Sequence, residues 1–261
     1  MQEVEMNVDP HTPPNSGSTR LETPQMSEPA MIGNVFIEPG SVFEDQRRKP
    51  RFIIGGLVMI VAVSIFQIAF VQKFGLEDIM RARIESSSRT RDLSKEQKDK
   101  IIEQQSGPLA QYITYAAVPI AMVIAFLLGG LFYWLGSNAM GGTATFFGGV
   151  AVWVYSSLPP ALVFSAANVI VMFLKDPDTI NLATSQGGVL KANLSFFLDE
   201  KTMPVLSAVL GSVDLFGIWG WILAAIGLQK VAKISAGAAW AVVAILAVVG
   251  IAAKVAGALL F

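Results

Sequence analysis

The stretch that decides the fold is residues 52–71, FIIGGLVMIVAVSIFQIAFV. It contains no charged side chain over twenty consecutive residues, which is long enough for a helix to cross a hydrocarbon core of about 30 Å. Its one strongly polar member, Gln67, is expected to hydrogen-bond a neighbouring helix rather than to hold a ligand. The stretch therefore predicts a transmembrane helix.

Four further apolar stretches predict an all-α, polytopic membrane protein with five transmembrane helices. The third stretch is longer than one crossing requires and contains Pro159 and Pro160. A division at these prolines would leave a second piece too short to span, so we predict one long helix kinked there. Together with the first stretch, the expected spans are about 52–71, 112–135, 142–174, 213–229 and 236–260.

The composition excludes several classes of function. Hydrophobic residues make up 53% of the chain and charged residues 15%, against about 25% charged in typical soluble domains. A formal net charge of −1 argues against a nucleic-acid-binding surface. There is no cysteine, and the single histidine, His11, lies in a polar N-terminal segment. We therefore expect no catalytic residues, no metal site and no cofactor.

The N-terminal part divides into a tail and a membrane-associated segment. Residues 1–30 hold no apolar stretch of the signal-peptide kind and are expected to form a disordered polar tail. The membrane domain is expected to cover 31–261. Within it, 31–49 is interpreted as interfacial helices lying on the membrane, because Val42 and Phe43 adjoin charged residues. A pair of ordinary surface turns is the alternative.

Two short patterns predict helix starts outside the spans. Ser41-Val42-Phe43-Glu44 has the form of a capping box at the start of a short helix. Ser94-Lys95-Glu96-Gln97 has the same form inside the charged segment 72–111. A charge-rich helix at this place is expected to be a solvated face, with partner binding as the alternative.

The third span carries an ordered set of polar residues. Ser157, Ser165 and Asn168 lie on one helical face, because the steps 157, 161, 165 and 168 follow the helical period. Such a face more often hydrogen-bonds a neighbouring helix than lines a water-filled path. Asn168 is kept as a candidate functional residue.

One acid, Asp214, stands at the head of the fourth apolar stretch. If 204–212 is a separate helix, Asp214 can cap the next helix at the edge of the bilayer, with Trp219 slightly deeper as an interfacial or packing aromatic. The alternative buries Asp214 mid-membrane as a proton or ion site, at a cost of about 2.5–3.5 kcal/mol if it is unpaired. We prefer the cap, because a buried Asp214 would have no cation to pair with: Lys230 and Lys233 lie about four turns away, at the other end of the helix. The fourth span then begins after Asp214 and is short for a full crossing.

The distribution of basic residues gives conflicting signals about orientation. Arg47, Arg48, Lys49 and Arg51 adjoin the first span and predict a cytoplasmic N-terminus. The turn with Lys230 and Lys233 would then also be cytoplasmic. Segment 72–111 carries eight Lys and Arg against seven acids and, by a plain count, favours the reverse. We give priority to the compact first cluster, which predicts a cell (inner) membrane protein with its N-terminus in the cytoplasm.

Several segments together resemble the bacterial branch of the Yip1-domain family. They are Glu38-Pro39-Gly40-Ser41-Val42-Phe43, Tyr155-Ser156-Ser157-Leu158-Pro159, Asp214-Leu215-Phe216-Gly217-Ile218-Trp219 and Ala224-Ala225-Ile226-Gly227-Leu228. The resemblance covers roughly 31–261. It implies five transmembrane helices, a cytoplasmic N-terminus and no known catalytic residue.

The resemblance also limits what can be expected of partners. Eukaryotic relatives act in vesicle trafficking and associate with prenylated small GTPases, and they carry an acidic-Leu-Tyr-Gly-Pro motif in the N-terminal region that this chain lacks. A GTPase partner is therefore not expected. We expect a non-enzymatic membrane scaffold that contacts the lipid bilayer and a membrane-protein partner or a second copy. A small transporter or channel component using the kinked third helix is the alternative, and a membrane-embedded enzyme is the weakest hypothesis.

Overall fold

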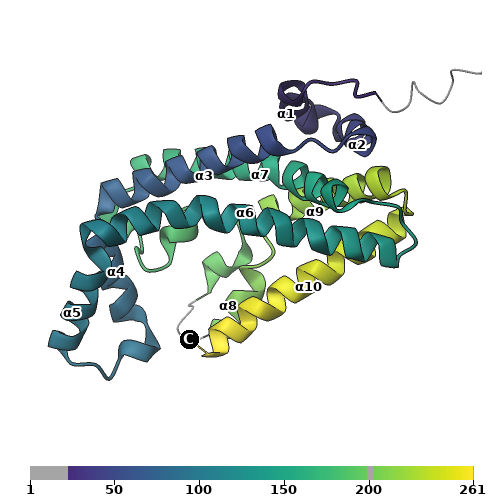
Figure 1. Cartoon of the computed structure of the whole chain (residues 1–261). Coiled ribbons are helices and arrows are strands. Elements are labelled where there is room, and N and C mark those ends of the chain that lie inside the picture. Colours follow the sequence, from purple (N-terminus) through teal and green to yellow (C-terminus); the bar gives the residue numbers. More distant parts are fainter. Residues whose placement is uncertain (1–22, 199–202, 261) are drawn as a thin grey trace, which may run out of the picture.

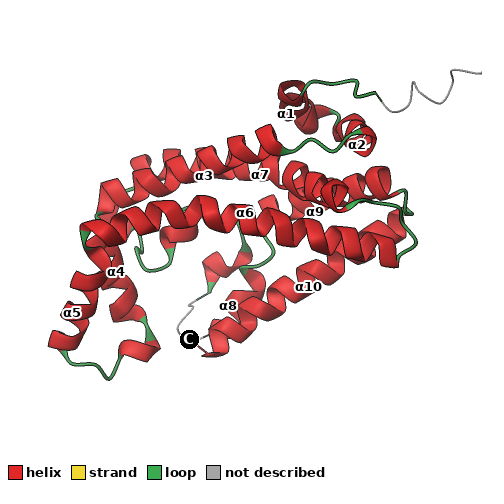
Figure 2. Cartoon of the chain, viewed as in Figure 1, coloured by secondary structure: helices red, strands yellow, loops and turns green. Residues whose placement is uncertain are grey.

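The computed structural model describes residues 23–198 and 203–260, and in this part of the chain it contains helices and no strand (Figure 2). Most of the predicted polar tail, residues 1–22, lies outside the described residues. Five of the described helices are long and apolar enough to cross a membrane, so the predicted all-α, five-span class is confirmed. They are α3 (Ile53–Phe74), α6 (Pro108–Ala139), α7 (Phe146–Leu174), α9 (Leu215–Ala232) and α10 (Ala236–Leu260).

The central helix of the bundle is α7, which packs against α3, α6 and α9 (Figure 1). It runs without interruption through Pro159 and Pro160, both of which are buried. Close packing on α6 depends on glycine, because a Cβ at Gly130 would lie 2.3 Å from a Val150 methyl carbon. The five long helices leave apolar side chains exposed on their outer faces, and lipid covers these faces.

Two short helices, α1 (Glu28–Ile37) and α2 (Pro39–Arg48), lie along the flank of α7 and α9 (Figure 1). Val42 and Phe43, the residues that suggested contact with the membrane, are fully buried in protein. The capping box predicted at Ser41 is wrong. Helix α2 begins at Pro39, which starts a helix readily because the first turn needs no amide hydrogen, and the Ser41 hydroxyl donates to the Glu38 carbonyl at 2.8 Å.

A charged pair of helices, α4 (Leu76–Ser86) and α5 (Lys95–Ser106), projects from the end of the bundle opposite to α1 and α2 (Figure 1). The capping box predicted at Ser94 and Gln97 is confirmed. Arg81 joins the two helices through Asp99 at 3.0 Å and also pairs with Glu77 at 3.1 Å. These hydrogen bonds raise the pKa of Arg81, so the link keeps its charge.

The segment between α7 and α9 folds back along the bundle. It contains three short 3-10 turns, η3 (Pro177–Thr179), η4 (Ser185–Gly187) and η5 (Leu194–Phe197), and then α8 (Pro204–Leu210), which packs against α10 (Figure 1). Ile180 and Val189 are buried in a cluster with residues of α3, α4 and α7. The segment therefore covers the flank of the spanning helices and forms part of the cavity described next.

Candidate functional site

Asp214 caps α9, as the sequence suggested. Its Oδ1 accepts the amide hydrogen of Gly217 at 2.7 Å, and α8 is a separate helix before it. Asp214 also forms an isolated antiparallel bridge with Asn193, and the Leu215 amide donates to the Ala192 carbonyl at 3.3 Å. The carboxylate thus satisfies the free amide end of a spanning helix.

The cap lies well inside the length of α7. Phe216, two residues after Asp214, packs against Phe164 with ring centroids 5.1 Å apart. Phe164 precedes the end of α7 at Leu174 by ten residues (164 to 174), which corresponds to about 15 Å of helix. With 29 residues, α7 is about 43 Å long, which exceeds the hydrocarbon core of about 30 Å, so the position of Asp214 at the edge of the bilayer stays a prediction.

Asn168 hydrogen-bonds the non-helical segment that folds back along the bundle between α7 and α9. This side chain is fully buried; its Nδ2 donates to the Phe164 carbonyl at 2.8 Å, and its Oδ1 accepts the Leu190 amide at 2.8 Å. Backbone amides within a membrane need such internal partners. The expected bond to a neighbouring helix is therefore a bond to the backbone of the folded-back segment.

Asp214 faces a cavity of about 480 Å³ between α6, α7, α9 and α10. Apolar and aromatic side chains supply most of its lining, and Pro160 is among them. Its polar lining comes from Tyr133, Ser156, Ser157, Ser212, Asp214 and Lys254. The described residues contain no ion pair between Asp214 and Lys254. The cavity is therefore an apolar space with one acid and one base in its wall.

The other predicted residues take part in packing. Trp219 lies against Phe36 of α1 in an edge-to-face contact, with ring centroids 5.9 Å apart. Pro159 is buried inside α7 but does not line the cavity, whereas Pro160 does. Sequence reasoning did not single out Lys254 as a residue that lines the cavity. A lone base in the fifth apolar stretch was the available signal, and only the tertiary fold brings it to the same cavity as Asp214.

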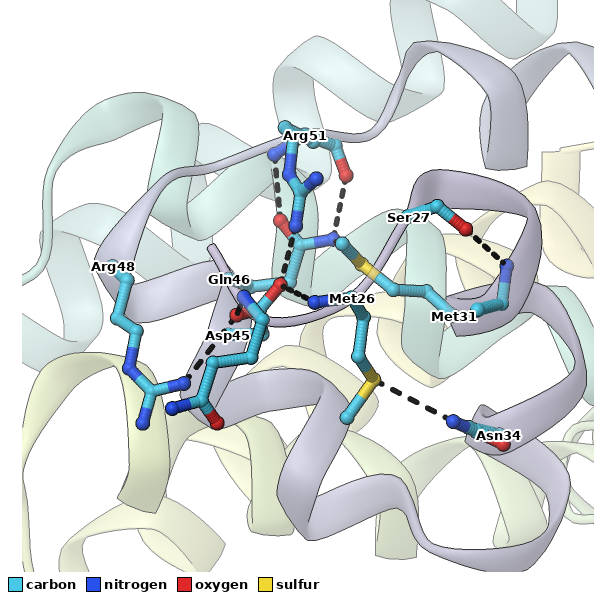
Figure 3. Close-up of polar contacts among 10 residues, drawn as sticks. Met26, Ser27, Met31, Asn34, Asp45, Gln46, Arg48 and Arg51 are labelled. Carbon is cyan, nitrogen blue, oxygen red and sulfur yellow. Dashed lines mark hydrogen bonds and ion pairs between the residues drawn. The ribbon is translucent and has the colours of Figure 1, made fainter. Parts of the chain in front are cut away.

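A second polar group, also missed from the sequence, joins α1, α2 and α3 (Figure 3). Asp45 is fully buried, accepts the Gln25 amide at 2.6 Å and pairs with Arg51 and, at 3.4 Å, with Arg48. The Gln46 amide exchanges two hydrogen bonds with the backbone of Arg51, at 2.6 Å and 2.5 Å. These contacts fix the turn between α2 and α3.

The fold brings together two of the segments that carry the family resemblance. Phe43 of α2 is fully buried against α9, and a Cβ at Gly227 would lie 3.0 Å from the Phe43 ring and 2.9 Å from a Val152 methyl carbon. Glycine at 227 therefore permits the close approach of α2. The motifs around residues 43 and 227 act as one packing unit.

The chain is similar in sequence to known membrane proteins. The Yip1 domain model matches residues 33–257. The chain is 28% identical over 213 residues to "Membrane protein YknW" of Bacillus subtilis (strain 168), which covers 82% of this chain and 83% of that protein. No solved structure matches. Within the described residues, no group of three His, Cys, Asp or Glu side chains is placed to hold a metal ion.

Proposed function

Since the chain belongs to the Yip1 domain family, we propose that it is a non-enzymatic multi-pass membrane protein that acts as a scaffold. It would work through contacts with lipid and with a membrane-protein partner or a second copy of itself. We place it in the cell (inner) membrane with a cytoplasmic N-terminus, because the basic residues before α3 adjoin the membrane.

The observation that carries this proposal is the mainly apolar cavity beside Asp214. Its volume of about 480 Å³ suits a lipid acyl chain or the apolar side chains of a partner helix. The polar groups nearby have structural uses: Asp214 caps α9, and Asn168 holds the Leu190 amide. Histidine and cysteine are absent from all the spans, so the usual nucleophile–base pairs are missing.

The alternative of a small transporter or channel is not supported by the family match or by the name of the relative. Five spans do not divide into two matched halves, as inverted-repeat transporters require.

The test is a substitution that fills the cavity and should therefore reduce the binding of lipid or of a partner helix. Gly250 of α10 lines the cavity, and a Cβ added there meets no atom within 4 Å, so Gly250→Leu can be accommodated. Gly257 lies on the same helix, also has open space around an added Cβ and does not line the cavity. Gly257→Leu is thus the matched control.

A photoreactive residue at Ala247, another lining position, is activated in intact membranes, and the adducts are identified by mass. We expect a lipid or protein adduct that falls at least severalfold with Gly250→Leu and persists with Gly257→Leu. Absence of both kinds of adduct, or equal loss in both variants, would contradict the proposal.

A further inference from the structure

A second, smaller cavity of about 220 Å³ lies where the end of α2 meets the start of α7 and the end of α9. Its polar lining comes from Gln46, Arg47, Thr143, Thr145 and Lys233, which belong to three segments far apart in the sequence. It shares no lining residue with the cavity beside Asp214. The two cavities therefore support independent inferences.

The cavity holds two basic side chains with no acidic partner. Among the described residues, Arg47 and Lys233 form no ion pair and no side-chain hydrogen bond. The nearby acids already have partners: Asp45 pairs with Arg48 and Arg51, and Glu44 pairs with Lys230 at 3.4 Å. The segments 44–51 and 230–233 together carry six basic and two acidic side chains. The cavity is thus left with uncompensated positive charge.

Neutral donors add to this charge at the start of α7. The Thr145 hydroxyl oxygen accepts the Gly148 amide at 3.0 Å, which leaves its hydrogen free to donate. The Thr143 hydroxyl has no hydrogen-bond partner among the described residues. The first amides of a helix have no partner within the helix, and its dipole favours an anion at this end. Gln46 closes one wall with its amide held by Arg51.

We propose that this cavity binds a phosphate group, which either a lipid headgroup or a soluble phosphate can supply. Phosphate offers several acceptor oxygens to a guanidinium, an ammonium and two hydroxyl groups, and such charge-assisted bonds are stronger than neutral ones. The volume of about 220 Å³ accommodates one such group. This inference goes beyond the scaffold role and does not depend on it.

Lys233 can be substituted by glycine to test the site without straining the backbone. Its φ is +58° and its ψ +34°, the left-handed conformation that glycine most often supplies at the end of a helix. Lys233→Gly therefore removes the ammonium group without straining the backbone, and we expect the variant to fold. Arg47→Gln removes the second cation from an independent element, α2.

The matched control is Lys49→Gln. Lys49 follows Arg47 by two residues, is exposed, and does not line the cavity. Each of the three substitutions removes one positive charge from the same end of the bundle. A difference between them therefore reports the cavity rather than the general attraction of a basic surface for anions.

The experiment measures binding of two probes to the full chain in detergent micelles. One probe is short-chain phosphatidylglycerol, with diacylglycerol of the same chain length, which lacks the phosphate, as the reference lipid, and the other is inorganic pyrophosphate. We expect Lys233→Gly and Arg47→Gln each to weaken phosphatidylglycerol binding about tenfold, and Lys49→Gln to change it by less than twofold.

The same loss with pyrophosphate alone would support the site with a soluble phosphate as its ligand. Equal effects of all three substitutions would overturn the proposal, because they would indicate diffuse surface attraction. Equal binding of phosphatidylglycerol and of the phosphate-free diacylglycerol by the unmodified chain, with no binding of pyrophosphate, would also overturn it.

Discussion

At the scale of single residues, the polar side chains near the spans mostly satisfy backbone groups. Asp214 accepts an amide at the start of α9, and Asn168 accepts one from the folded-back segment. An unpaired amide in an apolar environment is costly, so the need to satisfy these amides explains the polar residues without a catalytic or transport role. The carboxylate of Asp214 still faces the cavity, so the cap and the charge need separate tests.

Substitution of Asp214 separates the two roles. Asparagine caps helices about as well as aspartate, whereas alanine costs about 0.5–2 kcal/mol. We expect Asp214→Ala to lower the melting temperature in detergent and Asp214→Asn to leave it nearly unchanged. An equal loss of stability in both variants would contradict the cap as the main role and would point to the charge itself.

At the scale of elements, the sequence predicted what local pattern controls and missed what tertiary contact controls. The five spans and the cap at Ser94 follow from apolar length and local spacing, and both are present. The burial of Phe43 depends on packing of α2 against α9, which no local pattern reveals. The link between the Asn168 side chain and the Leu190 amide is likewise a long-range contact.

The candidate site divides in the same way. The cap at Asp214 was predictable, because a capping residue and the helix it caps adjoin in the sequence. The cavity is lined jointly by Asp214, Ser156 of α7 and Lys254 of α10, so it exists only after the helices pack. The phosphate-binding cavity joins Arg47 to Lys233 across 186 positions (47 to 233), again through the approach of α2 to α9.

The polar contacts of Asp45 at the turn between α2 and α3 lead to a prediction about stability. Asp45 is fully buried between Arg48 and Arg51, whose side chains are 13% and 18% exposed. Asp45→Ala would leave two nearly buried guanidinium groups without their partner, and loss of one partner in a buried pair costs about 3–5 kcal/mol. We expect a clear fall in melting temperature and faster proteolysis before α3.

Glu44→Ala is the control for this prediction. Glu44 adjoins Asp45 and pairs with Lys230, but both side chains are nearly half exposed, so the pair contributes about 0–1 kcal/mol. Thermal unfolding in detergent should distinguish the two alanine variants. Similar melting temperatures for both would mean that the buried ion pairs of Asp45 do not stabilise the turn between α2 and α3.

At the scale of the whole molecule, the two compact basic groups gather at one end. Glu44 contacts Lys230 at 3.4 Å, so the residues before α3 and the turn after α9 lie together. The charged pair α4 and α5 lies at the other end (Figure 1). Segment 72–111 spreads eight bases over forty positions, whereas 44–51 and 230–233 place six bases within twelve positions next to the spans. This concentration of Lys and Arg beside the spans supports the proposed cytoplasmic location of the end with α2.

Reporter fusions test this orientation. Five spans with a cytoplasmic N-terminus put the C-terminus outside, so alkaline phosphatase fused there should be active, since that enzyme needs an oxidising compartment for its disulfides. The same reporter inserted between Lys233 and Ala236, in the turn after α9, should be inactive at equal expression. The reverse pair of activities would invert the orientation. Two active fusions would instead mean that α10 does not cross the membrane, because the span between the fusion sites would then have both ends on one side.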